Sequence, residues 1–376
     1  MPLVPVPVLS DGVVSLRAHR EEDVQAVVEQ CNDPLSVRWT TVPVPYGVAD
    51  AQRFVREAMP GGWASDQEWA FAVEVDGRFG GTVSLRNLAG GRAEIAYGAH
   101  PAIRGTGAME RALRLLLDWG FSPEGRGLEA VIWYAYPGNW GSRRLAWRLG
   151  FDVVTGVLHR WVDHRGTPYD VWAGTLTRDD PREPRTPWLE APVLDLGEVG
   201  LRPLAERDEA RIVEAARDET VSFWIGSIPV PFEPEHARSW REDRTEAAAS
   251  AAAVTWAIVD ADDALLGVVN VFNLGVRPGE GEVGYWLHPA GRGRGIAVLA
   301  ARAAARHALV AIEDGGLGLS RVRLASAVDN EASRRVAQAV GFRYVGLERQ
   351  GTICRDGRHD TALYDLLPAD LAQRDA

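Results

Sequence analysis

Short β-prone segments bounded by turn residues recur in the same order in both halves of the chain. In each half, three of them follow one another with only turns between, as at Asp76-Gly77, so we expect an antiparallel meander. The strands predicted in chain order are 14–17, 69–75, 79–85, 93–99 and 129–134, then 199–202, 254–259, 265–272, 282–287 and 321–327. Two closing strands are expected in each half, ending near Leu176 and Leu366.

Apolar residues at helical spacing predict helices between these strands. The prolines in segments 39–46 and 224–232 exclude helix and predict a loop in each half. The predicted helices are 21–30, 50–58, 109–119 and a short helix after Asn139, then 206–217, 233–245, 297–311 and a short helix after Asn330.

Two motifs occur once in each half, which indicates an internal repeat. The motif His-Pro-x-x-Arg-Gly-x-Gly spans 100–107 and returns 188 residues later at 288–295. The motif Asn-x-x-Ser-Arg-Arg spans 139–144 and returns at 330–335. The two halves therefore have the same expected fold.

A segment rich in proline and charged residues separates the two halves and predicts an exposed, fairly stiff linker. We predict an N-terminal domain at 1–180, a linker at 181–192 and a C-terminal domain at 193–376.

Each glycine motif lies between a predicted strand and a predicted helix. A helix start presents unpaired N–H groups and the positive end of the helix dipole. Glycine lets an anionic group approach that backbone closely. Each copy is therefore predicted to form a cradle for a phosphate or pyrophosphate.

Composition narrows the class of protein. The net charge of −11 and the pI of about 5.3 argue against a broad nucleic-acid surface. The two cysteines, Cys31 and Cys354, cannot form a disulfide framework and suit a reducing cytosol. We find no signal peptide, no membrane-spanning segment and no cluster of metal ligands. We expect a cytoplasmic protein without a metal and without membrane or nucleic-acid partners.

The order of strand, Arg-Gly-x-Gly turn, helix, strand, Asn-x-x-Ser helix and Gly-Phe strand resembles the GNAT superfamily of N-acetyltransferases. The motifs are similar to those of its ribosomal-protein-alanine (Rim-type) branch, over about 10–178 and 193–368. The resemblance implies the α/β (α+β) class, with two tandem GNAT folds. In each, a central mixed, largely antiparallel, twisted sheet is flanked by helices and splayed to admit CoA. It also implies acetyl-CoA, or another acyl-CoA, as the acyl donor substrate.

The resemblance assigns CoA contacts to three sets of positions in each half. Main-chain N–H groups of the glycine turn would hold the pyrophosphate, the end of the preceding strand would pair with pantetheine, and the Asn that opens the later helix would touch the pantetheine or phosphate arm. In the first half these positions are Arg104, Gly105, Thr106, Gly107 and Ala108, then Ala99 and His100, and Asn139. In the second half they are Arg292, Gly293, Arg294, Gly295 and Ile296, then Leu287 and His288, and Asn330.

The sequence departs from the superfamily at two kinds of position. Ala102 and Ala290 stand where Gln or Arg usually begins the glycine motif. Ala146 and Ala337 stand where many members place a Tyr, so that Tyr cannot be the general acid in either half.

Amide formation from a thioester needs a base for the amine and a proton for the departing thiolate. Glu94 and Glu282 are the candidate bases; the alternative is a solvated carboxylate at a strand edge. Ser142 and Ser333 are candidates to bond the thiolate and relay a proton; the alternative is a local helix cap.

Two further pairs are interpreted without a catalytic role. Tyr97 and Tyr285 are read as core residues or as part of the wall of an acceptor pocket. His100 and His288 precede prolines in both copies, and we interpret them as structural turn residues.

The sequence predicts an N-acyltransferase that transfers an acyl group directly from CoA to a primary amine of a small molecule or a peptide N-terminus. In a second hypothesis, one half has lost catalysis and is a scaffold or CoA-sensing module, with the second half active. A third, a nucleotide-binding non-enzyme, is disfavoured because no Lys-Ser/Thr follows the glycines and no GxGxxG occurs. The repeat predicts a pseudo-dimer within one chain, which is either monomeric or a homodimer.

Overall fold

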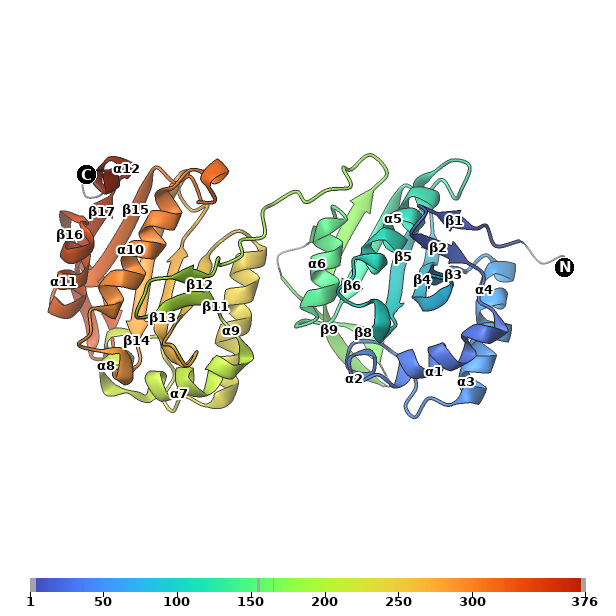
Figure 1. The fold of residues 1–376 in the computed structure, drawn as a ribbon, viewed down its shortest axis with the longest axis horizontal. Coiled ribbons are helices and arrows are strands. Elements are labelled where there is room, and N and C mark those ends of the chain that lie inside the picture. The colour runs from blue at the N-terminus through green and yellow to red at the C-terminus, as the bar shows by residue number, and fades with distance from the viewer. Residues whose placement is uncertain (1–4, 154–155, 165, 373–376) are drawn as a thin grey trace. The chain divides into compact units, whose positions relative to one another are not determined.

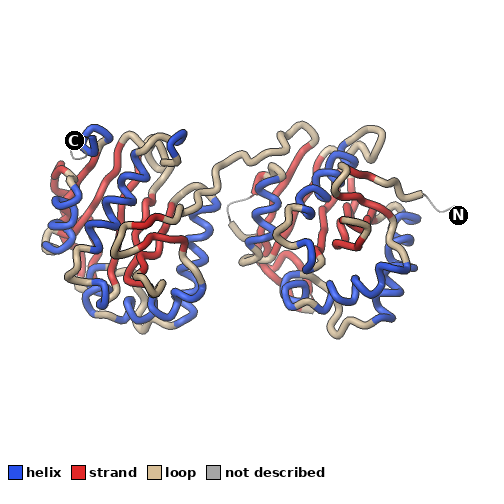
Figure 2. Tube along the Cα trace, in the orientation of Figure 1, coloured by secondary structure: helices blue, strands red, loops and turns tan. Residues whose placement is uncertain are grey.

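The computed structural model describes residues 5–153, 156–164 and 166–372. The chain divides into two compact units, Met1–Arg185 and Thr186–Ala376, here called the first and the second unit. Each unit has its own sheet, with helices on both faces (Figures 1 and 2). The two units follow the same order of elements, so the repeat seen in the sequence is a repeat of the fold.

The sheet of the first unit is mixed and largely antiparallel, in the order β1-β2-β3-β4-β5-β6-β9-β7, with β8 paired to β9. Among its described pairs, β5 and β6 alone run parallel. Its strands are β1 (Leu9–Ser10), β2 (Val14–Arg17), β3 (Glu68–Val75), β4 (Arg78–Ala89), β5 (Arg92–Ala99), β6 (Ala130–Ala135), β7 (Asp152–Val153), β8 (Leu158–His164) and β9 (Thr167–Thr177).

The sheet of the second unit repeats this topology in the order β10-β11-β12-β13-β14-β15-β17-β16, with β14 and β15 parallel. Its strands are β10 (Leu194–Asp195), β11 (Gly200–Pro203), β12 (Val254–Val259), β13 (Leu265–Phe272), β14 (Glu280–Leu287), β15 (Arg321–Ala327), β16 (Arg343–Cys354) and β17 (Gly357–Leu366). A single strand, β16, stands where the first unit has β7 and β8.

The α-helices of the first unit are α1 (Val24–Asn32), α2 (Pro34–Trp39), α3 (Val48–Arg53), α4 (Met59–Ser65), α5 (Ala108–Phe121) and α6 (Trp140–Arg148). Those of the second unit are α7 (Glu209–Arg217), α8 (Glu219–Trp224), α9 (Pro234–Ala249), α10 (Ile296–Leu309), α11 (Glu331–Val340) and α12 (Pro368–Ala372). No helix in the described parts of the chain is both long enough and apolar enough to pass through a membrane.

A separate hydrophobic core lies on each face of each sheet. In the first unit, α5 buries Leu113, Leu116 and Leu117 in the larger core, while α1 and α3 cover the other face. In the second unit, α10 presents a row of fully buried alanines to the sheet, and α7 and α9 cover the opposite face. The small alanine side chains let α10 lie close against the strands.

The two parallel strands of each sheet pair over a short distance and then diverge. In the first unit, ladder pairs run only from Arg92 with Ala130 to Ile95 with Trp133, although β5 continues to Ala99. In the second unit, pairing of β14 with β15 ends at Glu282 with Arg323, although β14 continues to Leu287. Each sheet therefore forks, which confirms the expected mixed, splayed sheet.

Most predicted elements are confirmed to within a few residues, and two predictions need correction. The helix predicted at 50–58 is part of a longer helical run from α3 through a π-helical turn at Phe54–Ala58 to α4. The sequence did not predict this extension because it contains Pro60 and two glycines at 61–62, residues that usually end helices. Segments 39–46 and 224–232 are indeed mostly loop, but their first residues, Trp39 and Trp224, close α2 and α8.

We predict that Asp23→Ala lowers the free energy of unfolding by about 3 kcal/mol, because it removes a partner from a buried cation. Arg17 donates to both Asp23 oxygens, at 2.7 and 2.9 Å, and these side chains are only 5% and 4% exposed. Asp50→Ala is the matched control, because Asp50 also accepts a backbone N–H but pairs with the exposed Arg53. Its expected cost is about 1 kcal/mol. Urea unfolding measures both, and equal losses would contradict this account.

Candidate functional site

A glycine turn joins the unpaired end of β5 to α5, and a matching turn joins β14 to α10. Gly105 and Gly107 have φ of 76° and 83°, and Gly293 and Gly295 have φ of 75° and 74°. This left-handed conformation favours glycine. A Cβ atom built on any of the four would meet no atom within 4 Å, so each turn faces open space.

The turns leave backbone donors unused. No acceptor is recorded among the described residues for the N–H groups of Gly105 and Gly107, or for those of Gly293 and Gly295. The first-turn N–H groups of α5 and α10 add to these donors, together with the positive end of each helix dipole. Thr106 caps its own turn, since its hydroxyl accepts from Ala108 N–H at 3.3 Å. The open space and the free donors fit an anionic group such as a pyrophosphate.

The two turn arginines have a different role from the one expected. The N–H of Arg104 donates to Pro101 O and that of Arg292 to Pro289 O, so neither N–H is free for a ligand. The side chain of Arg104 donates to Asp33 at 2.6 Å, and that of Arg292 donates to Asp218 at 2.5 Å.

Each of these aspartates caps a helix. Asp33 accepts from the first N–H groups of α2, and Asp218 from those of α8. The hydrogen bond from Arg292 holds the pKa of Asp218 below its ordinary value. The arginines therefore fasten the glycine turn to α2 and to α8, and their N–H groups do not add to the free donors of the cradle.

The main chain at the histidines is also already in use. The N–H of His100 donates to Gly80 O at 2.9 Å, and its C=O accepts from Ile103 N–H at 3.1 Å. His288 makes the same two bonds, to Leu266 O and from Gly291 N–H, both at 2.9 Å. The N–H groups of His100 and His288 are therefore not free to pair with an added strand such as pantetheine.

The side chains of the histidines close the same turns. Nδ1 of His100 accepts from Ala102 N–H at 3.2 Å, and Nδ1 of His288 from Ala290 N–H at 3.1 Å. Because N–H groups alternate sides along a strand, the residues just before the histidines, Ala99 and Leu287, direct their main chain toward the fork.

A tyrosine and a serine hydroxyl meet beside each fork. Tyr97 and Ser142 have their oxygens 2.8 Å apart, and those of Tyr285 and Ser333 are 3.0 Å apart. Burial raises the pKa of Tyr97 and Tyr285 to about 12, so both hydroxyls keep their proton at neutral pH. Sequence reasoning had set the tyrosines aside, although each stands three residues after a candidate glutamate in both copies.

Asn139 and Asn330 cap the helices that carry these serines. The Oδ1 atom of Asn139 accepts from Ser142 N–H at 3.2 Å, and that of Asn330 from Ser333 N–H at 3.1 Å. The cap fixes the first turn of α6 and α11 and so positions the serine hydroxyl against the tyrosine.

The two candidate bases have different surroundings. Glu94 on β5 forms an ion pair with Arg86 on β4, with a closest distance of 2.6 Å. Glu282 on β14 accepts from Asn273 Nδ2 at 3.3 Å, and burial raises its pKa.

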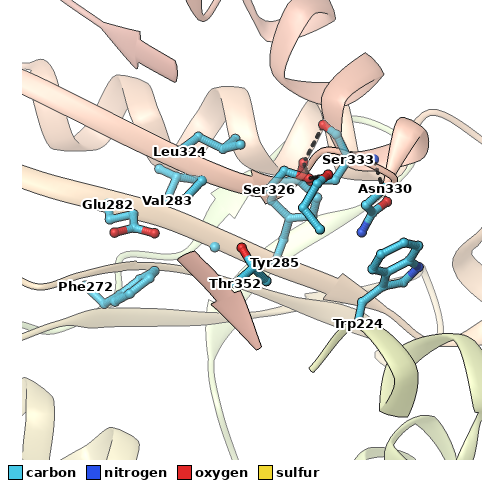
Figure 3. A pocket seen from close by; sticks show the side chains of 13 residues that line it. Trp224, Phe272, Glu282, Val283, Tyr285, Leu324, Ser326, Asn330, Ser333 and Thr352 are labelled. Atoms are coloured by element: carbon cyan, nitrogen blue, oxygen red, sulfur yellow. Dashed lines mark hydrogen bonds between the residues drawn. The ribbon is translucent and has the colours of Figure 1, made fainter. Parts of the chain in front are cut away.

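A cavity of about 180 Å³ lies beside the fork of the second unit (Figure 3). Glu282 and Phe272 lie at one end, and Ser333, Asn330 and Trp224 at the other (Figure 3). Its lining residues also include Val283, Gly284, Tyr285, Leu324, Ala325, Ser326, Ala327 and Thr352. The structure thus brings the predicted Glu282, Ser333 and Asn330 into one cavity.

Several positions in or beside the Asn-x-x-Ser-Arg-Arg motif have a structural role. Ala146 and Ala337, which replace the expected tyrosine, are 1% and 0% exposed in the core. Arg143 is buried with its guanidinium 4.6 Å from the ring of Trp172, and Arg334 donates to Val328 O at 3.0 Å. No group of three or more His, Cys, Asp or Glu that could hold a metal ion occurs within 5–153, 156–164 and 166–372.

Each unit is an α/β fold with a forked mixed sheet, a glycine turn with free donors and two paired hydroxyls beside the fork. This combination is typical of transferases that take an acyl group from a carrier molecule. The chain belongs to the GNAT acetyltransferase family: the model of the acetyltransferase (GNAT) domain matches residues 14–152 and 198–343. The family uses acetyl-CoA as its acyl donor, and one match falls in each unit.

One curated relative is the putative ribosomal N-acetyltransferase YdaF of Bacillus subtilis (strain 168), which is 34% identical over 106 residues. That match takes in 28% of this chain and 55% of the relative, so the chain spans about half of the relative's length.

Solved structures match one unit's length of the chain. A probable acetyltransferase is 27% identical with a TM-score of 0.41, covering 47% of this chain and 98% of that one. Mycobacterium smegmatis RimJ in complex with CoA-disulfide is 23% identical with a TM-score of 0.42, covering 48% of this chain and 88% of that one.

We predict that the chain binds two CoA molecules and that Gly107→Glu and Gly295→Glu each remove one. The added carboxylate lies in the anion cradle, where it repels the pyrophosphate. Gly275→Glu is the control, because Gly275 has φ of 80° and equally open space but lies at the opposite end of β14. Isothermal titration should count two sites for the wild type and the control, and one for each cradle variant. Two sites in both cradle variants would contradict the assignment.

Proposed function

We propose that this protein is an acyl-CoA-dependent N-acyltransferase that transfers the acyl group directly to a primary amine. The observation that carries the proposal is the hydrogen-bonded pair of Tyr and Ser hydroxyls beside a fork that opens next to an anion cradle. Direct transfer requires both substrates in one site, and the fork, the cradle and the cavity of the second unit offer adjoining places for them.

The glycine turns and the free strand ends are the proposed CoA contacts. Unpaired N–H groups would bind the pyrophosphate, and the main chain of Ala99 and Leu287 would pair with pantetheine along the open strand edge. The side-chain amides of Asn139 and Asn330 would contact the same arm with Nδ2, since Oδ1 serves the helix cap. The proposed positions with an unpaired N–H are Gly105, Gly107, Gly293, Arg294, Gly295 and Ile296, whereas Thr106 N–H donates to Ile103 O and Ala108 N–H to the Thr106 hydroxyl, both at 3.3 Å.

The chemistry needs one group that accepts a proton and one that donates it. The amine must lose a proton as its nitrogen bonds to the thioester carbonyl, and the departing thiolate must gain one. Glu282 or Glu94 would accept the first proton, directly or through water. The tyrosine hydroxyl, protonated at neutral pH, would supply the second through its bond to Ser333 or Ser142.

The proposed acceptor is the amine of a peptide N-terminus or of a small molecule. The name of the B. subtilis relative refers to ribosomal acetylation, which favours a peptide or protein amine. The cavity of the second unit combines the aromatic rings of Trp224 and Phe272 with the carboxylate of Glu282. Such a wall suits an amine borne on a partly apolar group.

We predict that Tyr97→Phe with Tyr285→Phe lowers kcat roughly 100-fold or more, because it removes the proton donor from both units. CoA affinity should stay unchanged, since the cradles are untouched. Tyr344→Phe is the control, because that hydroxyl is on the exposed strand β16. The measurement is thiol release from acetyl-CoA across a panel of peptides and small amines. Full activity in the double variant would exclude the tyrosines, and no thiol release by the wild type with any amine would exclude the function.

A further inference from the structure

The two candidate bases face different residues across the sheet. Arg86 on β4 stands directly opposite Glu94 in the ladder, and Phe272 on β13 stands directly opposite Glu282. A cross-strand neighbour on the same face lies within reach of its partner's side chain. The neighbour of Glu94 is therefore a cation, whereas the neighbour of Glu282 is an apolar ring.

Both oxygens of Glu94 are already engaged. Oε1 accepts from Arg86 Nε at 3.0 Å and Nη2 at 2.6 Å, and Oε2 accepts from Asn87 Nδ2 at 2.6 Å. The Glu94 side chain is only 18% exposed, so the ion pair is partly shielded from water. Arg86 and Asn87 therefore occupy both oxygens of Glu94, at the positions where an amine would have to approach.

Glu282 is held far more loosely. Its recorded partner is Asn273, at 3.3 Å, and no Arg or His nitrogen of the described chain lies within 4.0 Å of it. Arg323 on the neighbouring β15 is the nearby cation; it forms an ion pair with Glu280, at 3.1 Å, and tends to lower the pKa of Glu282. Burial outweighs this influence and leaves the pKa raised, which suits a base working near neutral pH.

The hydroxyl pairs also have different neighbours in the two units. In the first unit, the indole Nε1 of Trp133 donates to Tyr97 Oη and to Ser142 Oγ, each at 3.1 Å. In the second unit, Leu324 occupies the equivalent place on β15 and lines the cavity. The indole therefore occupies acceptor positions on both hydroxyls of the first unit, whereas Leu324 has no donor to offer those of the second.

We infer that the second unit performs acyl transfer, whereas the first unit binds acyl-CoA without turning it over because Arg86 holds Glu94 in an ion pair. This inference rests on the proposed function and assigns it to one of the two sites. Arg86 is a positioning residue, since it acts through Glu94 and not on the substrate.

The first test compares Glu282→Gln with the double variant Glu282→Gln/Arg86→Phe, using an amine that the wild type accepts. The single variant should lose at least tenfold in kcat/KM, and adding Arg86→Phe should raise the residual turnover at least tenfold by releasing Glu94. A loss of less than tenfold would show that the first unit already works and would overturn the inference. Absence of any rise in the double variant, with two CoA sites still counted, would overturn the role of Arg86.

The second test transplants the ion pair. Phe272→Arg should lower kcat/KM at least tenfold below Phe272→Leu, which also removes the ring but adds no charge beside Glu282. The second readout is the pH profile of kcat/KM, corrected for the protonation of the amine. Its acid limb should move to lower pH in Phe272→Arg, because a guanidinium beside Glu282 lowers the pKa of that carboxyl group. If kcat/KM of Phe272→Arg is lower at every pH but the acid limb does not move, the substitution has only a packing effect, and the inference is overturned.

Different measurements test the proposed function and its assignment to the second unit. The proposed function fails if the wild type releases no thiol with any amine. The assignment to the second unit fails if turnover is present in the wild type and survives Glu282→Gln.

Discussion

The fork in each sheet is the constraint on which the site depends. A β-strand in a sheet interior satisfies its N–H and C=O groups on both sides, and unpaired groups are costly when buried. β5 and β14 lose their parallel neighbours after Ile95 and Glu282, yet continue to Ala99 and Leu287. The main chain beyond that point has no strand partner on that side, and in the proposed function an extended, amide-bearing arm such as pantetheine would pair with it as an added strand.

The position of the glycine turn relative to this free edge is set by two ion pairs. Arg104 reaches from the turn to Asp33, and Arg292 to Asp218, so a single side chain joins the cradle to the cap of α2 or α8. The same arginines also donate to the carbonyls of Ala99 and Leu287, at 3.1 and 3.4 Å. Cradle, strand end and capped helix thus form one connected polar unit in each half, which explains why the arginine recurs in both motifs although its own N–H is not free for a ligand.

Duplication lets two copies of one site diverge while the fold is kept. The parts that maintain the fold agree closely: the left-handed glycines, the Asn caps and the arginine ties are the same in both units. The differences lie beside the candidate base and the hydroxyl pair, where Arg86 corresponds to Phe272 and Trp133 to Leu324. These substitutions change charge and hydrogen bonding without changing the ladder, so the sheet tolerates them.

Much of this protein follows from local sequence. The glycine turns, the Asn caps and most strands and helices depend on neighbours within a few residues, and they were predictable because φ preferences and capping act over that range. The partners of Arg104, Glu94 and Tyr97 lie 71, 8 and 45 residues away, and no periodic pattern announces them. Only the tertiary structure decided that the arginine joins the turn to a helix cap, that the tyrosine meets the serine, and that one glutamate is paired with an arginine while its copy is not. The physical reason is that these properties arise from the register of paired strands and the packing of helices on them, which bring distant side chains into contact.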